Sequence, residues 1–176
     1  KIILFGTGGS NLGARALHNI NNNKKIEIEF YDNIDPITFE QFFKSLDFKT
    51  TGFIVISKSG KTPETLSQFS SLYQVALQTN NIDEFLSNTL VITEFTDSPL
   101  YNIARKSDCL TLEHSKEIGG RFSVFSNVGI VPAILSGLNI NKLYSGAAEV
   151  INNMDKYSVL HLGRYLCFQE NKKFNS

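Results

Sequence analysis

The segment Phe53-Ile54-Val55-Ile56-Ser57-Lys58-Ser59-Gly60-Lys61-Thr62-Pro63 joins an apolar run directly to a helix start. Residues 53–57 do not alternate between apolar and polar, which is typical of a strand buried on both faces of a sheet. Proline suits the first turn of a helix, because the backbone N–H that it lacks would have no partner there. Residues 64–77 carry apolar side chains three and four positions apart, which predicts an amphipathic helix. A buried strand followed by a loop and a helix is the building block of a parallel sheet.

The same alternation extends along the chain on both sides of this segment. Further apolar or β-branched runs occupy Ile2–Phe5 and residues 26–31, 90–93 and 108–112. Helical spacing appears in residues 11–20 and 39–46, and Pro36 and Pro99 mark further helix starts as Pro63 does. The pattern predicts an α/β fold in which a parallel sheet with right-handed crossovers carries helices on both faces.

The last third of the chain, residues 123–170, contains no strand candidate and predicts three helices. We expect breaks at residues 137–139 and around residues 152–157. Pro132 lies inside the run 123–138, where it predicts a kink or a join between two helices.

Composition limits the classes of function. The 176 residues are 41% hydrophobic and 19% charged, and 17 basic residues balance 17 acidic ones. This indicates a soluble globular domain, and the balance argues against a nucleic-acid or anionic-membrane partner. Two cysteines and three scattered histidines predict neither a disulfide framework nor a metal site. Without a membrane-spanning run or a signal sequence, we expect a cytoplasmic protein. Because the chain begins at Lys1, directly before an apolar run, we expect it to be a piece of a longer protein.

A glycine-rich loop, Gly6-Thr7-Gly8-Gly9-Ser10-Asn11-Leu12-Gly13, follows the first run. Glycines let the backbone approach a ligand closely, and the helix after the loop offers N–H groups to an anion. The dinucleotide-binding pattern G-x-G-x-x-G is incomplete here, since Asn11 takes its sixth position counted from Gly6. Asp32, at the end of the second run, keeps that alternative open, and a tight turn without a ligand is the other.

Residues 57–65 combine hydroxyl groups, two lysines and a glycine immediately before a helix. A phosphate monoester binds N–H and O–H donors at a helix N-terminus, so the segment predicts a phosphate site rather than an ordinary Ser/Thr loop. The end of the segment is similar to a Walker A motif, but Val55 stands where that motif needs glycine, which excludes an NTPase.

Residues 117–123 place Arg121 after a Gly-Gly pair. An arginine in this position could stabilise an oxyanion that develops on a substrate, although a lone loop arginine is more often a surface residue. His114 and Glu117 lie near it in sequence, and we expect both to be solvated loop residues.

Together the three loops resemble the glucose-6-phosphate isomerase family, from the first strand to at least Leu143. The matching motifs are Gly8-Gly9-Ser10 with Leu12-Gly13, Ser57-Lys58-Ser59-Gly60-x-Thr62-x-Glu64-Thr65, and Gly119-Gly120-Arg121-Phe122-Ser123-x-x-Ser126-x-Val128-Gly129. The second motif is also shared by other sugar isomerase (SIS) domains that bind phosphosugars. The resemblance implies a three-layer, flavodoxin-like SIS domain with a five-stranded parallel sheet flanked by helices. Residues 1–176 would form one such domain of a protein with two.

The resemblance also implies the reaction and its residues. Glucose 6-phosphate and fructose 6-phosphate would interconvert through a cis-enediol, with no metal or organic cofactor. The implied roles are phosphate binding by Ser57, Ser59 and Thr62 with Lys58 nearby, a sugar pocket lined by Gly9 and Ser10, and enediolate stabilisation by Arg121 held by Gly120.

The family also uses a glutamate base, a ring-opening histidine and a C-terminal lysine, and no segment of this chain matches them. We therefore expect the chain alone to bind phosphosugar weakly and to lack turnover, and the full-length protein to be a homodimer. The alternative is a non-catalytic phosphosugar-binding SIS module of a regulator.

Overall fold

The computed structural model describes residues 1–22 and 24–170, with side chains described as far as residue 166. The chain divides into two compact units, Lys1–Leu138 and Asn139–Ser176. The first unit holds the sheet and the helices that cover it, and the described part of the second unit is helical. One domain spanning residues 1–176 stays a prediction.

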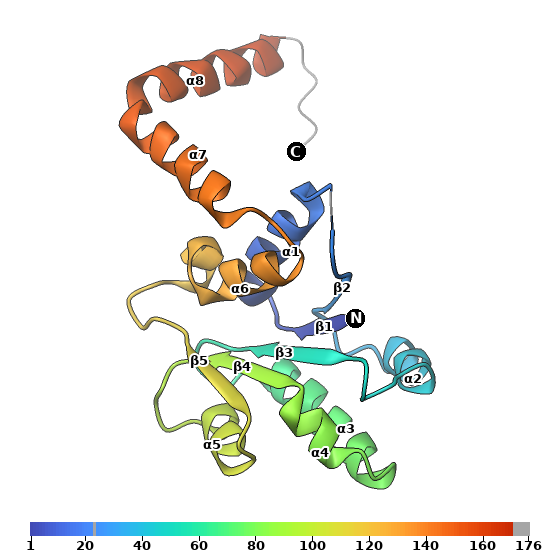
Figure 1. Ribbon diagram of the computed structural model, residues 1–176. Coiled ribbons are helices and arrows are strands. Elements are labelled where there is room, and N and C mark those ends of the chain that lie inside the picture. Colours follow the sequence, from blue (N-terminus) through green and yellow to red (C-terminus); the bar gives the residue numbers. More distant parts are fainter. Residues whose placement is uncertain (23, 171–176) are drawn as a thin grey trace. The chain divides into compact units, whose positions relative to one another are not determined.

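The first unit is an α/β fold around a five-stranded parallel sheet (Figure 1). Its strands are β1 (Ile2–Phe5), β2 (Ile28–Tyr31), β3 (Gly52–Ile56), β4 (Thr89–Thr93) and β5 (Leu110–Glu113). Its helices are α1 (Gly9–Ile20), α2 (Pro36–Lys44), α3 (Pro63–Gln78), α4 (Ile82–Ser87), α5 (Pro99–Lys106) and α6 (Asn127–Leu135), with a 3₁₀ helix, η1, at Gly120–Phe125.

The strands lie side by side in the order β2-β1-β3-β4-β5, and every neighbouring pair is parallel. The chain moves outward from β1 to β2, then crosses back to place β3 on the other side of β1. The direction of winding therefore changes between β1 and β3. In such sheets, ligands bind outside the carboxyl ends of the strands at this switch point.

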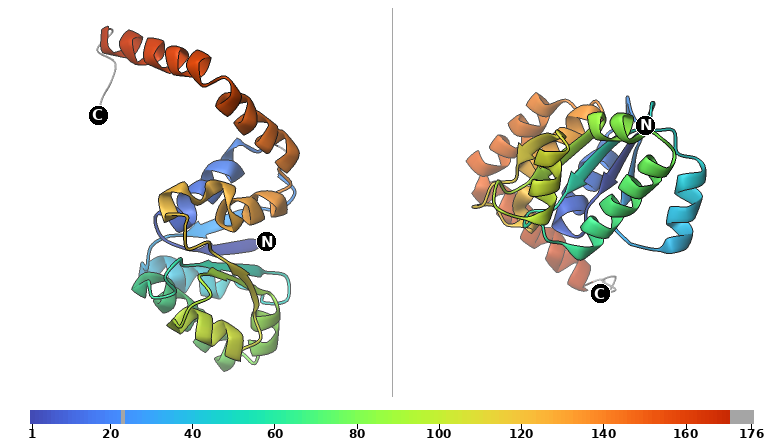
Figure 2. Two further views of the ribbon diagram at one scale, coloured as in Figure 1. Left: turned by 90° about the vertical axis from the view of Figure 1, so that its left-hand side faces the viewer. Right: turned by 90° about the horizontal axis from the view of Figure 1, so that it is seen from below.

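Helices cover both faces of the sheet, as Figures 1 and 2 show. Successive side chains of a strand point to opposite faces, so each strand contributes to two cores. One core packs β1, β3 and β4 against α2, α3, α4 and α5, and the other packs them against α1 and α6. This explains why β1, β3 and β4 read as largely continuous apolar runs rather than as alternating ones.

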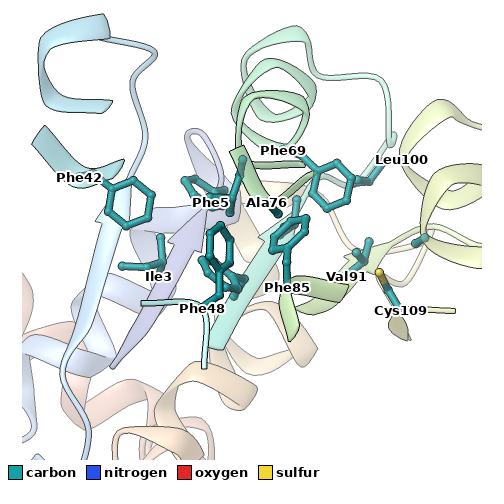
Figure 3. Packing of buried hydrophobic residues seen from close by; sticks show 14 of the residues in the cluster. Ile3, Phe5, Phe42, Phe48, Phe69, Ala76, Phe85, Val91, Leu100 and Cys109 are labelled. Carbon is teal, nitrogen blue, oxygen red and sulfur yellow. The ribbon is translucent and has the colours of Figure 1, made fainter. Parts of the chain in front are cut away.

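Aromatic rings fill much of the first core (Figure 3). The rings of Phe53 and Phe85 meet edge to face, with centroids 5.2 Å apart, and Phe69 lies 5.5 Å from Phe85. All three side chains are at most 1% exposed. Burying one such ring contributes about 1.5–3 kcal/mol, which makes this cluster a main source of the fold's stability.

The predicted helix starts at Pro36, Pro63 and Pro99 are confirmed. The five strands are confirmed too: β1 has the predicted bounds, and the end points of the others differ by at most two residues. The predicted run 108–112 becomes β5 two residues later, because Asp108 has a positive φ of 53° and belongs to the turn after α5. The short helix α4 was not predicted.

Pro132 corrects one expectation. It lies inside a single helix, α6, so the predicted join between two helices is wrong. The ring removes only the bond that its N–H would make to the carbonyl of Val128. The side chain of Pro132 is buried, so its packing offsets that loss.

The second unit contains α7 (Ile140–Asn152) and α8 (Met154–Glu170). Asn139 begins α7, because its side-chain oxygen accepts a hydrogen bond of 3.0 Å from the backbone N–H of Lys142. Asn153 alone separates the two helices, so the predicted three helices in the last third, α6, α7 and α8, are confirmed. None of the helices in the described residues is both long and apolar enough to span a membrane.

Candidate active site

Three loops at the carboxyl edge of the sheet contain the residues that the sequence singled out. The first, residues 6–8, follows β1 and leads into α1, which begins at Gly9. The second, residues 57–62, follows β3 and is called the phosphate loop below. The third, residues 115–121, follows β5 and is called the arginine loop. Because β1 and β3 flank the switch point, the first two loops flank the position where ligands bind in this architecture.

The phosphate loop folds back on itself through short-range hydrogen bonds. The backbone N–H of Gly60 donates to the carbonyl of Ser57 at 3.1 Å, which closes a turn. The hydroxyls of Ser57 and Thr62 lie 2.8 Å apart, and the backbone N–H of Lys61 donates to Ser59 Oγ at 3.2 Å. The loop therefore gathers the hydroxyl groups of Ser57, Ser59 and Thr62 before the first turn of α3.

Gly60 is the one residue of this loop that must lack a side chain. Its φ is +62°, in the left-handed region that glycine adopts without strain. A Cβ on this residue would lie 2.2 Å from Ser98 Oγ, and its carbonyl accepts a hydrogen bond of 3.1 Å from Leu100 N–H. The phosphate loop thus packs tightly against the start of α5.

The N-terminus of α3 remains open for an anion. Thr62 is the residue before the helix, but its side chain makes no capping hydrogen bond and pairs with Ser57 instead. Pro63, in the first turn of α3, has no backbone N–H of its own. The positive end of the helix dipole and the uncapped N–H groups of the first turn suit a phosphate.

Lys58 points away from the hydroxyl groups of its own loop toward the arginine loop. Its Nζ donates a hydrogen bond of 2.8 Å to the carbonyl of Lys116 and lies 3.6 Å from Glu94 Oε1. Glu94 follows β4 directly. A phosphate contact by Lys58, which the family resemblance implied, stays a prediction.

Gly9 and Gly120 bring the arginine loop against the first turn of α1. A Cβ on Gly9 would lie 2.3 Å from the carbonyl carbon of Gly120 and 2.8 Å from the backbone nitrogen of Arg121. Ser123 Oγ donates to the carbonyl of Gly120 at 2.6 Å and lies 3.4 Å from that of Gly9. The backbone of Arg121 is therefore fixed by contacts with a loop more than a hundred residues earlier.

The side chain of Arg121 is exposed, and it lines a hollow of about 150 Å³. The lining residues are Gly9, Leu12, Gly13, Gly120, Arg121 and Val124. Ser10 is half-buried in the first turn of α1, where its N–H donates to the carbonyl of Thr7 at 3.1 Å. The structure thus brings Gly9, Gly120 and Arg121 together and joins Lys58 to the arginine loop.

His114 corrects another expectation. It is fully buried rather than solvated: it follows β5 directly, and its backbone N–H pairs with the carbonyl of Thr93 at 2.9 Å. Glu117 is exposed, as expected. Sequence reasoning also missed Glu94, although an acidic residue directly after a predicted strand was a usable signal.

Asp32, the acid on which the dinucleotide alternative depended, is paired with a side chain of the fold. Asp32 follows β2 directly, and its Oδ2 forms an ion pair of 3.1 Å with the guanidinium of Arg15. The guanidinium also lies over the ring of Phe30, 5.4 Å from its centroid. These contacts give Asp32 a structural role within the fold.

A larger hollow of about 400 Å³ lies between α2 and α3. Its described lining includes Phe39, Phe43 and Glu40 but no lysine or arginine. It therefore suits a phosphorylated ligand less well than the loops at the carboxyl edge. Among the residues that the structure describes, no three histidine, cysteine, aspartate or glutamate side chains gather as a metal site would require.

Comparison with known proteins identifies the family. The family model for phosphoglucose isomerase matches residues 1–159. The chain belongs to this family. A phosphoglucose isomerase relative from Rubrobacter xylanophilus, named glucose-6-phosphate isomerase, is 30% identical over 89% of this chain and 38% of its own length.

Two solved structures share the architecture. Hypothetical protein TT0462 from Thermus thermophilus is 30% identical, with a TM-score of 0.79 over 85% of this chain and 36% of that protein. A glucose-6-phosphate isomerase from Chlamydia trachomatis is 28% identical, with a TM-score of 0.66 over 77% of this chain and 26% of that protein. The chain thus spans well under half the length of the phosphoglucose isomerases that it matches.

Proposed function

We propose that this chain supplies the phosphate loop and the electrophilic arginine of a glucose-6-phosphate isomerase. The enzyme would interconvert glucose 6-phosphate and fructose 6-phosphate through a cis-enediol. The observation that carries the proposal is the contact between Gly9 and Gly120, which sets Arg121 beside the switch point that the phosphate loop also flanks. Membership of the phosphoglucose isomerase family supports the same reaction.

In the proposed mechanism, the phosphate group anchors the substrate. The hydroxyls of Ser57, Ser59 and Thr62 donate to its oxygens, and the N-terminus of α3 adds its dipole. Gly9 and Ser10 line the sugar pocket, and the absence of a side chain on Gly9 lets the backbone of Gly120 and Arg121 close against it. Binding energy from the phosphate, which does not react, then holds the sugar in place.

Arg121 acts on the reacting carbons. Removing a proton from the carbon beside the carbonyl leaves negative charge on the enediolate oxygen. The guanidinium of Arg121 stabilises that charge, because arginine keeps its positive charge at every pH at which proteins work. The interaction strengthens as the charge develops, so it lowers the barrier more than it favours substrate binding. Moving the proton between C1 and C2 also requires a base, and we assign none among the described residues.

The proposal extends to the setting of the enzyme. The full-length protein would act in glycolysis and gluconeogenesis in the cytoplasm as a homodimer, with phosphorylated hexose as its partner and no nucleic acid or membrane. The resemblance to the family implies that the reaction uses neither a metal nor an organic cofactor. The 176-residue chain alone would bind phosphosugar weakly and lack turnover.

Steady-state kinetics of the complete gene product test the proposal, with fructose 6-phosphate as substrate. We expect Arg121→Ala to lower kcat about 100-fold or more while KM changes little. Thr62→Val keeps the side-chain shape and removes the hydroxyl, so KM should rise about tenfold. The matched control is Arg105→Ala, which removes an exposed arginine from the last turn of α5 and should change neither constant.

Two results would contradict the assignment. If Arg121→Ala raised KM and left kcat unchanged, Arg121 would not stabilise the transition state. If Thr62→Val left KM unchanged, Thr62 would not bind the phosphate. A wild-type protein that binds fructose 6-phosphate without converting it would instead favour the regulator alternative.

A further inference from the structure

We propose that Glu94 is a positioning residue, which holds the Lys58 ammonium as a bridge between the phosphate loop and the arginine loop. This inference rests on the proposed function and adds a residue to it. It also assigns Lys58 a different task from direct phosphate binding. Lys58 would hold the arginine loop in position, and the hydroxyl groups of the phosphate loop would bind the phosphate.

The contacts of Lys58 carry the first step of the argument. Its Nζ donates to the carbonyl of Lys116 at 2.8 Å, a distance typical of a strong charge-assisted hydrogen bond. The two residues are 58 positions apart in sequence and belong to loops after β3 and β5, which are not neighbours in the sheet. The side chain of Lys58 thus reaches across the end of β4 to join them.

Glu94 stands at the end of β4, in the middle of this bridge. Its Oε1 lies 3.6 Å from Lys58 Nζ, and the side chains of Lys58 and Glu94 are only 31% and 18% exposed. Partial burial weakens solvent screening, so the carboxylate attracts the ammonium more strongly than in a surface pair. The backbone N–H of Glu94 also donates to the carbonyl of Lys58 at 3.0 Å. Glu94 therefore holds Lys58 by both its backbone and its side chain.

The bridge ends five residues before Arg121. Lys116 itself lies in a short turn, in which the N–H of Ile118 donates to the carbonyl of Ser115 at 3.2 Å. Gly120, next to Arg121, is held against Gly9. The arginine loop is thus fixed at two points, by Lys58 at its start and by Gly9 at its end.

A bound phosphate explains why the carboxylate is needed. A phosphate dianion in the adjacent loop attracts the Lys58 ammonium and competes with the carbonyl of Lys116 for it. The negative charge of Glu94 opposes that shift and keeps the ammonium on the arginine loop. Without this charge, Lys58 would turn to the phosphate, and the loop that carries Arg121 would lose its attachment to Lys58.

The test combines kinetics with hydrogen exchange in the complete gene product. Glu94→Gln keeps the shape of the side chain and removes its charge. We expect kcat for fructose 6-phosphate to fall about tenfold while KM stays level or falls, because loosening Arg121 impairs the chemical step rather than phosphate binding. In the presence of inorganic phosphate, the amides of residues 116–121 should exchange faster than in the wild type. Glu94→Asp retains the charge and should restore both values in large part.

A double-mutant cycle shows whether Glu94 acts through Lys58. If it does, Glu94→Gln should change exchange and kcat little when Lys58→Met is already present. Lys61→Met is the matched control for exchange, since it removes a lysine from the same loop whose ammonium bonds no side chain or carbonyl in the described residues. It should leave the amides of residues 116–121 unchanged.

Several outcomes would overturn the inference: unchanged exchange in Glu94→Gln, a rise in KM with kcat unchanged, or a full effect of Glu94→Gln in the Lys58→Met background. Hydrogen exchange does not depend on turnover. If the wild type lacked isomerase activity, the proposed function would fail, while faster exchange in Glu94→Gln alone would still support the bridge.

Discussion

The contact between Gly9 and Gly120 gives the sharpest prediction about this site. In Gly9→Ala, the new methyl carbon would lie 2.3 Å from the carbonyl carbon and 2.4 Å from the carbonyl oxygen of Gly120. Ordinary contacts of a Cβ begin at 3.4 Å, so the two backbones must separate by about 1 Å. Both partners are main chain, and no flexible side chain can turn aside to relieve the clash.

The separation should cost both stability and rate. Overpacking of this kind costs about 1–3 kcal/mol of the free energy of unfolding. The separation displaces the arginine loop relative to α1, and a displacement of about 1 Å at a catalytic group lowers kcat on the order of 100-fold. The loss of stability and the loss of kcat should appear together in the same variant.

Gly119→Ala is the matched control. It adds the same methyl group to the arginine loop, two residues before Arg121, where the Cβ would meet only the ring of Phe122 at 3.4 Å. Phe122 is exposed and can move, so neither stability nor kcat should change appreciably. Urea unfolding at 25 °C gives the free energies, and the fructose 6-phosphate assay gives kcat. A Gly9→Ala variant as stable and as active as Gly119→Ala would refute the reasoning.

Further variants test the core, a buried thiol and a helix cap. Phe85→Ala should lower the free energy of unfolding by about 3–5 kcal/mol in a urea titration, since its ring is fully buried between Phe53 and Phe69. Burial, with a smaller contribution from Asp108, raises the pKa of Cys109 to about 11. In a Cys167→Ser variant, a thiol reagent should therefore modify Cys109 slowly at pH 8, and the rate of modification should rise as the pH approaches 11. Fast modification of the folded protein at pH 8 would contradict the burial of Cys109. Hydrogen bonds from Thr38 lower the pKa of Asp35 below 3.8, so the stabilisation that it gives α2 is present above that pH and is lost as the pH falls through the lowered value. The urea midpoints of wild type and Asp35→Ala should accordingly differ at neutral pH and converge in acid, and a constant difference would argue against the charged cap.

Local patterns in the sequence determined much of the first unit. Apolar or β-branched runs, most of them without strict alternation, located all five strands, and a capping residue before Pro36, Pro63 or Pro99 located three helix starts. These features depend on hydrogen bonding and steric limits within a few residues, so the sequence contains them directly. The same local chemistry marked the phosphate loop, since hydroxyl groups and a glycine before a helix suit an anion wherever the helix lies.

The relations between the loops were decided by the tertiary structure. The order β2-β1-β3-β4-β5 puts the loops after β1 and β3 at the switch point and lets Lys58 reach Lys116 past Glu94. It also packs Gly9 against Gly120, and the pairing of β5 with β4 places His114, which follows β5, out of solvent. Residues this far apart in sequence meet only through the winding of the whole sheet, which no short pattern specifies. The sequence by itself thus determined which chemical groups this protein carries, and the tertiary structure decided which of them act on one another.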